Sequence, residues 1–322
     1  MISTDVRADH RHDSVLVIVP HDVPALAGHL VGHQLPPLPT IVRPGCYHYL
    51  GNRLVKTLKR TLRGMVRIQL CGRFAVVLEG QPIESRLPGR QGRLLVAYLA
   101  TYHGQPVERT VLLDTLWPEG GAGAGGTLTV LLSKIRPLLA PAEIWGRRTL
   151  QLVLPAQSVV DLEIGTTSLH SAESAVALRD WRRAWPAALA AQYISRRRFL
   201  AEFEAAWIDQ WRRQLDVINE RALACYAEAC LGIGGTELPA AERAARRLVA
   251  HAPLAETGHQ LLMRALSARG DAAAALAAYD QLRQLLRDEL GVSPCPATQA
   301  LHGRLLRGQQ LDEPTRPATH AR

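Results

Sequence analysis

Alternating apolar and polar residues mark the first well-patterned stretch of the chain. From Val66 to Leu78 the apolar side chains occupy every second position on either side of Gly72, and residues 79–81 (Glu-Gly-Gln) then provide a turn. A period of two is typical of strands that bury one face. The segment therefore predicts a small antiparallel sheet.

Three helices and a hairpin are predicted after this sheet. Apolar residues recur every three or four positions in 90–103, 109–117 and 127–139. The first two segments stop at a glycine and a proline, the usual signals for a helix end. Residues 145–154 return to strand character around a Gly-Arg-Arg turn at 146–148. The order of sheet, three helices and hairpin is that of a winged helix-turn-helix domain.

Helical spacing continues from residue 161 almost to the end of the chain. The longest apolar stripe runs from Leu200 to Tyr226 and predicts one continuous helix. Shorter helices are predicted at four places further on: 238–251, 256–269, 272–290 and 297–307. Ala-rich helices of this length, joined by short turns, favour stacked antiparallel pairs of the tetratricopeptide (TPR) kind. The predicted fold class is mostly α, an N-terminal winged helix-turn-helix (α+β) followed by an all-α TPR-like helical repeat domain.

These patterns divide the chain into five segments. We predict a poorly patterned N-terminal extension over 1–64, a winged-helix domain over 65–154, a linker over 155–170, a helical repeat domain over 171–307 and a disordered tail over 308–322.

The third predicted helix has two distinct faces. Its leucines and Ile135 fall on one side and are expected in the core. The opposite side carries Thr127, Thr129, Val130, Ser133, Lys134 and Arg136. Hydroxyls, a methyl-bearing side chain and cations are the groups with which a helix in the major groove contacts base edges and phosphates. Taken alone, the stripe is more typical of an ordinary solvated helix face, but the winged-helix order around it favours DNA binding.

The predicted hairpin adds two cations to this surface. Arg147 and Arg148 form its turn. In winged-helix order the hairpin tip would sit over the adjacent minor groove or the sugar-phosphate backbone. Without that order, the two arginines would be an unremarkable turn.

The overall charge is compatible with an anionic partner. Lys and Arg number 38 against 29 Asp and Glu, a formal net charge of +9, and the excess lies in the first half of the chain. Five scattered cysteines are too few for a disulfide framework and indicate reduced thiols. The N-terminal sequence has neither an apolar run long enough to span a bilayer nor the pattern of a signal peptide, so a cytoplasmic protein without membrane association is expected.

Several short motifs of the winged-helix segment match a known pattern: residues 70–74 (LCGRF), 93–95 (RLL), 98–99 (YL), 117–118 (WP) and 132–136 (LSKIR). Through them the segment resembles the Streptomyces antibiotic regulatory protein (SARP) family of transcriptional activators, whose winged helix is of the OmpR type. Residues 161–306 resemble the bacterial transcriptional activation domain (BTAD) that follows in that family, through Pro253, Glu256, Tyr279, residues 288–292 (DELGV), Pro294 and Pro296. Finding both in the family's order is far more specific than either alone.

The resemblance implies a sequence-specific activator that binds direct repeats in promoter DNA. It would form a homo-oligomer on double-stranded DNA and contact RNA polymerase through its helical domain. Carried over residue by residue, it implies that Thr129, Val130, Ser133 and Lys134 face the groove. Arg136 would face a phosphate, and Arg147 and Arg148 would form the wing.

Two features depart from the family pattern. Pro137 lies inside the predicted recognition helix, where it should kink the helix. Residues 120–126 are a run of glycine and alanine, so the helix start is expected to be mobile until DNA orders it.

No catalytic constellation, metal-ligand spacing or cofactor motif stands out in the sequence. Gly121, Gly123 and Gly126 satisfy G-x-G-x-x-G in letters, but a predicted helix rather than a strand precedes them. The chain is therefore expected not to be an enzyme, and neither a cofactor nor a metal is expected. Two alternatives stay open. One is a helical-repeat scaffold whose basic N-terminal domain binds an acidic protein, and the other is a ligand-sensing repeat domain, which would need an apolar pocket.

Overall fold

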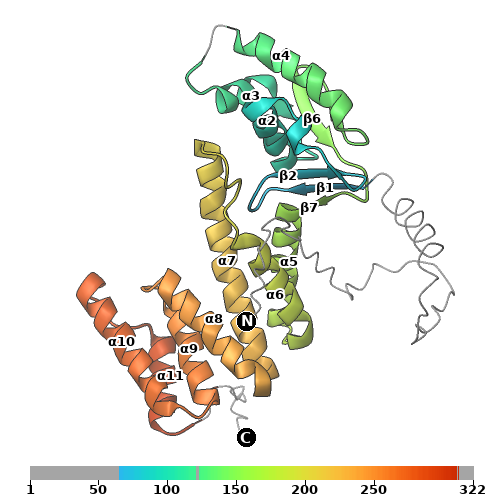
Figure 1. Cartoon of the computed structure of the whole chain (residues 1–322). Coiled ribbons are helices and arrows are strands. Elements are labelled where there is room, and N and C mark those ends of the chain that lie inside the picture. The colour runs from blue at the N-terminus through green and yellow to red at the C-terminus, as the bar shows by residue number, and fades with distance from the viewer. Residues whose placement is uncertain (1–64, 121–122, 310, 312–322) are drawn as a thin grey trace, which may run out of the picture. The chain divides into compact units, whose positions relative to one another are not determined.

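The structure is a computed structural model that describes residues 65–120, 123–309 and 311 (Figure 1). The predicted N-terminal extension, 1–64, lies outside the described residues. Most of the predicted tail does so too. One tail residue that is described, Leu311, is buried in the same hydrophobic cluster as Leu305.

The first sheet forms where the alternating pattern predicts it. Its strands are β1 (Val66–Gln69), β2 (Ala75–Leu78), β3 (Gln81–Pro82) and β7 (Val159–Val160), in the order β3-β2-β1-β7. β1 and β2 pair antiparallel, with Val66 opposite Leu78, so the alternate apolar residues share the buried face. This confirms the predicted antiparallel sheet. β7 pairs with β1 in parallel and was not foreseen.

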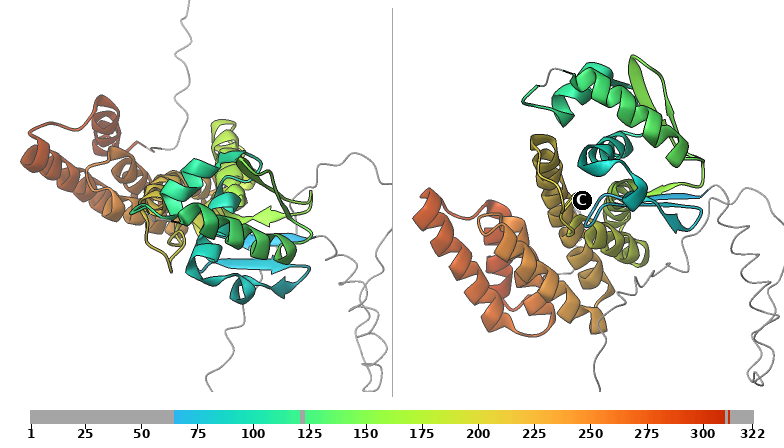
Figure 2. Two further views of the ribbon diagram at one scale, coloured as in Figure 1. Left: turned by 90° about the horizontal axis from the view of Figure 1, so that it is seen from above. Right: turned by 45° about the horizontal axis from the view of Figure 1, so that its top comes forward.

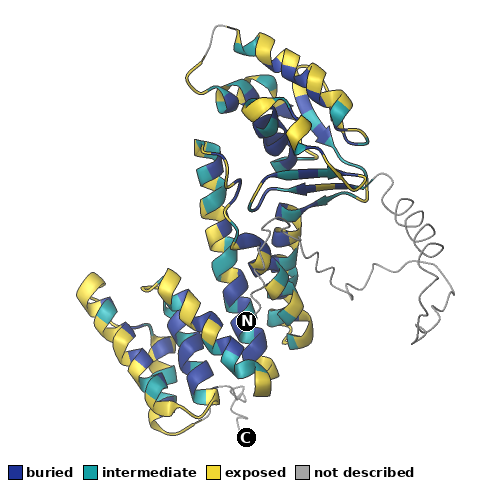
Figure 3. Cartoon of the chain, viewed as in Figure 1, coloured by how far each residue is buried: buried dark blue, intermediate teal, exposed yellow. Residues whose placement is uncertain are grey.

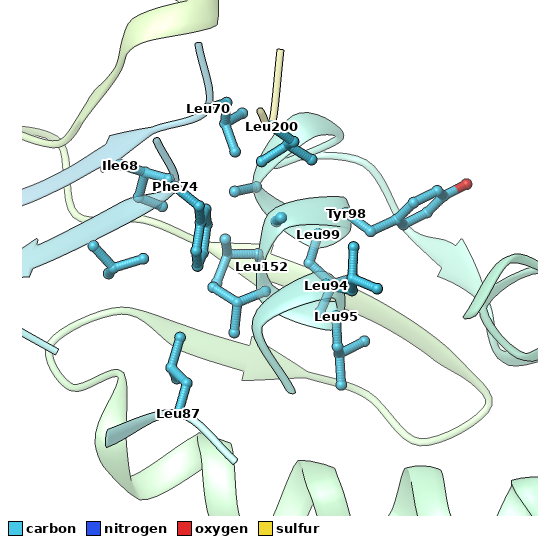
Figure 4. Packing of buried hydrophobic residues seen from close by; sticks show 14 of the residues in the cluster. Ile68, Leu70, Phe74, Leu87, Leu94, Leu95, Tyr98, Leu99, Leu152 and Leu200 are labelled. Carbon is cyan, nitrogen blue, oxygen red and sulfur yellow. The ribbon is translucent and has the colours of Figure 1, made fainter. Parts of the chain in front are cut away.

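Three helices and a second sheet complete the winged helix. The elements are η1 (Glu84–Arg86), α2 (Gly89–Thr101), β4 (Val107–Glu108), α3 (Arg109–Leu116), α4 (Ala124–Ile135), η2 (Arg136–Leu138), β5 (Glu143–Trp145) and β6 (Thr149–Val153). The β5–β6 hairpin is the wing, and β4 extends it on the β6 side. Figure 2 shows α4 and the wing together on the outer side of this domain. Helix α2 lies in the middle of the core, where Leu94, Leu95 and Leu99 pack beside Phe74 and Leu152 (Figure 4).

The remainder of the chain is helical. The helices are α5 (Asp161–Ala177), α6 (Trp181–Ser195), α7 (Ala206–Ile233), η3 (Gly235–Glu237), α8 (Leu238–His251), α9 (Glu256–Ala268), α10 (Ala272–Leu290) and α11 (Pro296–Leu306). Successive helices pack against one another, and small residues allow the close approach. A Cβ on Gly232 would overlap the Trp181 indole, for example. The predicted fold class, a winged helix followed by a helical domain, is confirmed.

The segment predicted as a linker, 155–170, is structured. It contains β7 and the first part of α5, so the helical domain begins at Asp161 and not at residue 171. The Asp161 carboxylate accepts the backbone N–H groups of Leu70 at 2.8 Å and Cys71 at 3.0 Å, which fixes the start of α5 to the end of β1. A two-residue strand such as β7 leaves no periodic signal in a sequence, and the predicted linker overlapped the segment from residue 161 in which helical spacing already begins.

The continuous helix predicted from Leu200 also needs correction. Helix α7 starts at Ala206, whereas Leu200 has a positive φ of 43° and donates its N–H to the Leu70 carbonyl at 2.8 Å. The apolar residues that precede α7 are nevertheless buried, because they fill the winged-helix core. Figure 4 shows Leu200 beside Leu70.

The two halves therefore share one hydrophobic cluster. Phe199, Leu200 and Phe203, from the connection between α6 and α7, are buried among the residues of the first sheet and α2. The Tyr98 and Trp207 rings meet edge to face with their centroids 5.0 Å apart. The winged helix is thus joined to the helical domain by packing as well as by the chain.

Candidate nucleic-acid interface

Helix α4 separates its apolar and polar residues as the pattern predicts. Leu128, Leu131, Leu132 and Ile135 are buried against the domain. The opposite face is exposed along the helix (Figure 3). The eight predicted site residues are all exposed on α4, η2 or the wing: Thr127, Thr129, Val130, Ser133, Lys134, Arg136, Arg147 and Arg148. We call this set the outer surface.

Three cations of the outer surface are electrostatically unpaired. Lys134, Arg147 and Arg148 form no ion pair with any carboxylate in residues 65–120, 123–309 and 311. Val130 lies on α4 one turn before Lys134, and it is 52% exposed. An exposed apolar methyl pair beside unpaired cations suits contact with a base edge and a phosphate.

The hydroxyls on α4 bond to the helix's own backbone. Thr127 donates to the Gly123 carbonyl at 3.2 Å, Thr129 to the Gly125 carbonyl at 2.9 Å and Ser133 to the Val130 carbonyl at 2.8 Å. Each hydroxyl hydrogen is thereby used within the helix. The oxygen lone pairs of Thr127 and Ser133 are left as acceptors for an incoming donor, whereas Thr129 Oγ1 already accepts a hydrogen bond from Arg109.

Arg136, which the resemblance places against a phosphate, is engaged with the wing. Its Nε donates to the Ile144 carbonyl at 3.1 Å and its Nη2 to the Gly146 carbonyl at 2.6 Å. These bonds connect the end of α4 to the hairpin immediately before its Arg147-Arg148 tip.

Arg109 belongs to the same surface, although sequence analysis treated it only as a helix start. Its Nη2 donates to the Gly125 carbonyl at 2.8 Å and to Thr129 Oγ1 at 2.6 Å. Its backbone N–H donates to the Arg148 carbonyl at 3.0 Å. No local pattern could have shown this role, because the partners lie 16 to 39 positions further along the chain.

The two departures from the family pattern have simple structural outcomes. Helix α4 ends at Ile135, and Pro137 lies in the 3-10 turn η2, so the expected kink inside the helix is wrong. Gly123 supplies a φ of 104° immediately before the first helical residue, Ala124. A side chain at Gly123 would strain this backbone, which gives the glycine a local role.

The helical domain contains a cleft of about 700 Å³. Its lining combines apolar residues such as Leu261 and Leu301 with charged ones such as Arg179. Within the described part of the chain, no helix is long and apolar enough to cross a bilayer.

Comparison with known families matches the helical domain. Residues 160–306 match the family model of the bacterial transcriptional activator domain. The chain is also 29% identical to the regulatory protein AfsR of Streptomyces griseus over 246 residues and 30% identical to AfsR of Streptomyces coelicolor over 258 residues. The chain therefore carries a bacterial transcriptional activator domain and is similar to the AfsR regulatory proteins.

The chain matches only part of those relatives. The matched residues make up 71% and 76% of the chain but 23% and 24% of the two AfsR proteins. The chain therefore spans about a quarter of the length of these AfsR relatives.

A solved structure supports the same fold. EmbR of Mycobacterium tuberculosis, solved in complex with a low-affinity phosphopeptide, superimposes on the chain with a TM-score of 0.68 at 24% identity. The match covers 77% of this chain and 66% of EmbR. At this identity the likeness establishes the shared fold, a winged helix with a helical domain. The OmpR-type assignment of the winged helix stays a prediction.

Proposed function

We propose that the chain is a sequence-specific DNA-binding activator of transcription that inserts α4 into the major groove. The observation that carries this is the outer surface, where an exposed helix face with an unpaired lysine lies beside a hairpin with two unpaired arginines. The known relatives, named as regulatory proteins, support a role in regulation.

Each part of the outer surface has a distinct task in this proposal. Val130 and Ser133 contact base edges from the middle of α4, where a hydroxyl accepts from an exocyclic amine and a methyl group packs on thymine. The Lys134 ammonium, at the edge of the groove, contacts a phosphate. Arg147 and Arg148 approach phosphates or the adjacent minor groove. Sequence preference then comes from the helix and most of the electrostatic attraction from the wing.

The helical domain, from Asp161 onward, contacts RNA polymerase in this proposal. The winged helix alone offers one recognition helix, and a single module of this size binds weakly. Binding of several copies to direct repeats in a promoter would raise the overall affinity, because the second contact becomes intramolecular. A homo-oligomer on DNA and polymerase recruitment together make the protein an activator.

The proposal is tested by duplex binding as a function of salt. A high-affinity duplex is first selected from a random pool with the full chain, and binding is then followed by fluorescence anisotropy between roughly 50 and 200 mM salt. Lys134→Ala should weaken binding and reduce the slope of log K against log salt by about one. Arg147→Ala and Arg148→Ala should each reduce the slope similarly.

Arg283→Ala provides the matched control. Arg283 is an exposed arginine on α10 that pairs with Asp280, far along the chain from the winged helix. Its removal should leave affinity and slope unchanged. Failure to select any duplex, together with capture of an acidic protein through Lys134, would favour the scaffold alternative over DNA binding.

A further inference from the structure

We infer that Arg109 and Arg136 are positioning residues that clamp the two ends of α4 to the wing, so that helix and hairpin form one preorganised DNA-binding surface. The inference rests on the proposed function for its consequence in DNA binding. The clamp itself is a property of the free protein and can be measured without DNA.

The clamp at the C-terminal end of α4 is Arg136. It follows the last helical residue, and its planar guanidinium reaches two carbonyls of the hairpin, Ile144 and Gly146. Charge-assisted bonds in this fork geometry are stronger and more directional than neutral ones. Because the two carbonyls flank Trp145, Arg136 fixes the strand that leads into the Arg147-Arg148 tip.

The clamp at the N-terminal end is Arg109. Its guanidinium bonds to Gly125 and Thr129 in the first turns of α4, and its own N–H bonds to the Arg148 carbonyl. The start of α4 lacks a side-chain cap and follows a glycine-rich segment, so little else fixes it locally. Arg109 therefore connects α3, the weakest end of α4 and the far side of the wing.

The two arginines thus act through other groups. The N–H groups of Arg136 that bond to the hairpin, and those of Arg109 that bond to α4, already have acceptors within the domain, in contrast to Lys134. A surface whose helix and hairpin are fixed beforehand loses less conformational entropy when it binds. Removal of a clamp should weaken DNA binding by loosening the surface, whereas removal of a phosphate contact should weaken it by deleting a charge.

The distinction is measurable with variants that keep the charge. Arg136→Lys retains a cation but loses the two-pronged fork of Nε and Nη2. Arg109→Lys retains a cation but loses the Nη2 group that donates to Gly125 and Thr129. Each is expected to weaken binding about tenfold, the loss of roughly one charge-assisted bond. The salt slope should stay that of the parent, because the number of neutralised phosphates is unchanged.

Hydrogen exchange in the DNA-free protein gives the second readout. Arg136→Lys should accelerate exchange of the hairpin amides between 144 and 149 about tenfold. Arg109→Lys should do so for the amides of 127–130, the first that are hydrogen-bonded within α4. Lys134→Ala is the matched control, with a reduced salt slope and parental exchange.

Two results would overturn the inference. One is parental exchange in both lysine variants. The other is an Arg136→Ala variant whose salt slope falls by about one while its hairpin exchange stays parental, which would make Arg136 a phosphate contact. If the parent binds no duplex, the proposed function fails, yet the exchange data still decide whether the clamp exists.

Discussion

The indole N–H of Trp211 donates to the hydroxyl of Tyr102 across 3.0 Å, which joins α7 of the helical domain to the end of α2 in the winged helix. The bond belongs to a row of aromatic contacts that also includes the edge-to-face pair of Tyr98 and Trp207. These contacts make the winged helix dependent on residues more than a hundred positions downstream.

Truncation at residue 154 should therefore destabilise the winged helix. A fragment of 65–154 lacks Phe199, Leu200 and Phe203, each buried in the shared cluster and worth about 1.5 to 3 kcal/mol. A fragment of 65–233 retains them and should melt cooperatively by circular dichroism. A 65–154 fragment as stable as the longer one would contradict the shared core.

Asp161 should contribute much more to the stability of the fold than its exposed neighbours do. Its carboxylate accepts hydrogen bonds from the backbone N–H groups of Leu70 and Cys71, which directly follow β1. Asp161→Ala removes the acceptor of both bonds. The free energy of unfolding in urea is expected to fall by roughly 2 to 3 kcal/mol. Glu163→Ala, two positions on and exposed, is the control and should change it by less than about 0.5 kcal/mol.

Glu256 should make the helical domain sensitive to acid. Burial raises the pKa of its carboxyl, but hydrogen bonds from Thr298 and Cys295 outweigh burial and hold the pKa below its usual value of 4.5. A lowered pKa in the folded state contributes stability above the unfolded-state pKa, and this is lost as the pH falls through the folded-state pKa.

The measurement is the unfolding free energy of Glu256→Gln against the parent over a pH series. The variant should be less stable at pH 7, and the difference should shrink as the pH falls below about 4.5. Glu289→Gln, exposed at the end of α10, should track the parent throughout. A pH-independent difference for Glu256→Gln would contradict the assignment.

Gly146 should be required by the wing. Its φ is 90°, and an added Cβ would lie 1.9 Å from the Thr149 carbonyl oxygen, so Gly146→Ala must distort the turn. We expect lower thermal stability and weaker duplex binding with all charges retained. Gly126→Ala is the contrast, since a Cβ there meets nothing within 4 Å, and it should stabilise the domain by up to about 1 kcal/mol.

The periodicity of apolar residues predicted the elements that have one solvent-exposed face and one buried face. The bounds of α8 and α10 agree with the predicted 238–251 and 272–290, and α4 turns its predicted polar residues outward. Each of these segments is long enough for its own residues to determine its structure.

Other features depend on contacts between distant segments and could not be predicted. Leu200 continues an apolar stripe in the sequence, but its backbone pairs with Leu70 and leaves the helical conformation. Arg136 is a surface cation in the sequence, yet its role is set by carbonyls of a hairpin whose position only the tertiary fold determines. Long-range hydrogen bonds have no periodic signature.

The position of Leu200 inside the winged-helix core has a consequence for promoter architecture in the proposed function. A protein whose two halves were tethered by a loose chain would tolerate any rotational phase between neighbouring binding sites. Here the helical domain must follow the recognition helix around the duplex axis. Insertion of half a helical turn, about 5 base pairs, between two repeats would carry the helical domains of the two bound copies to opposite sides of the DNA.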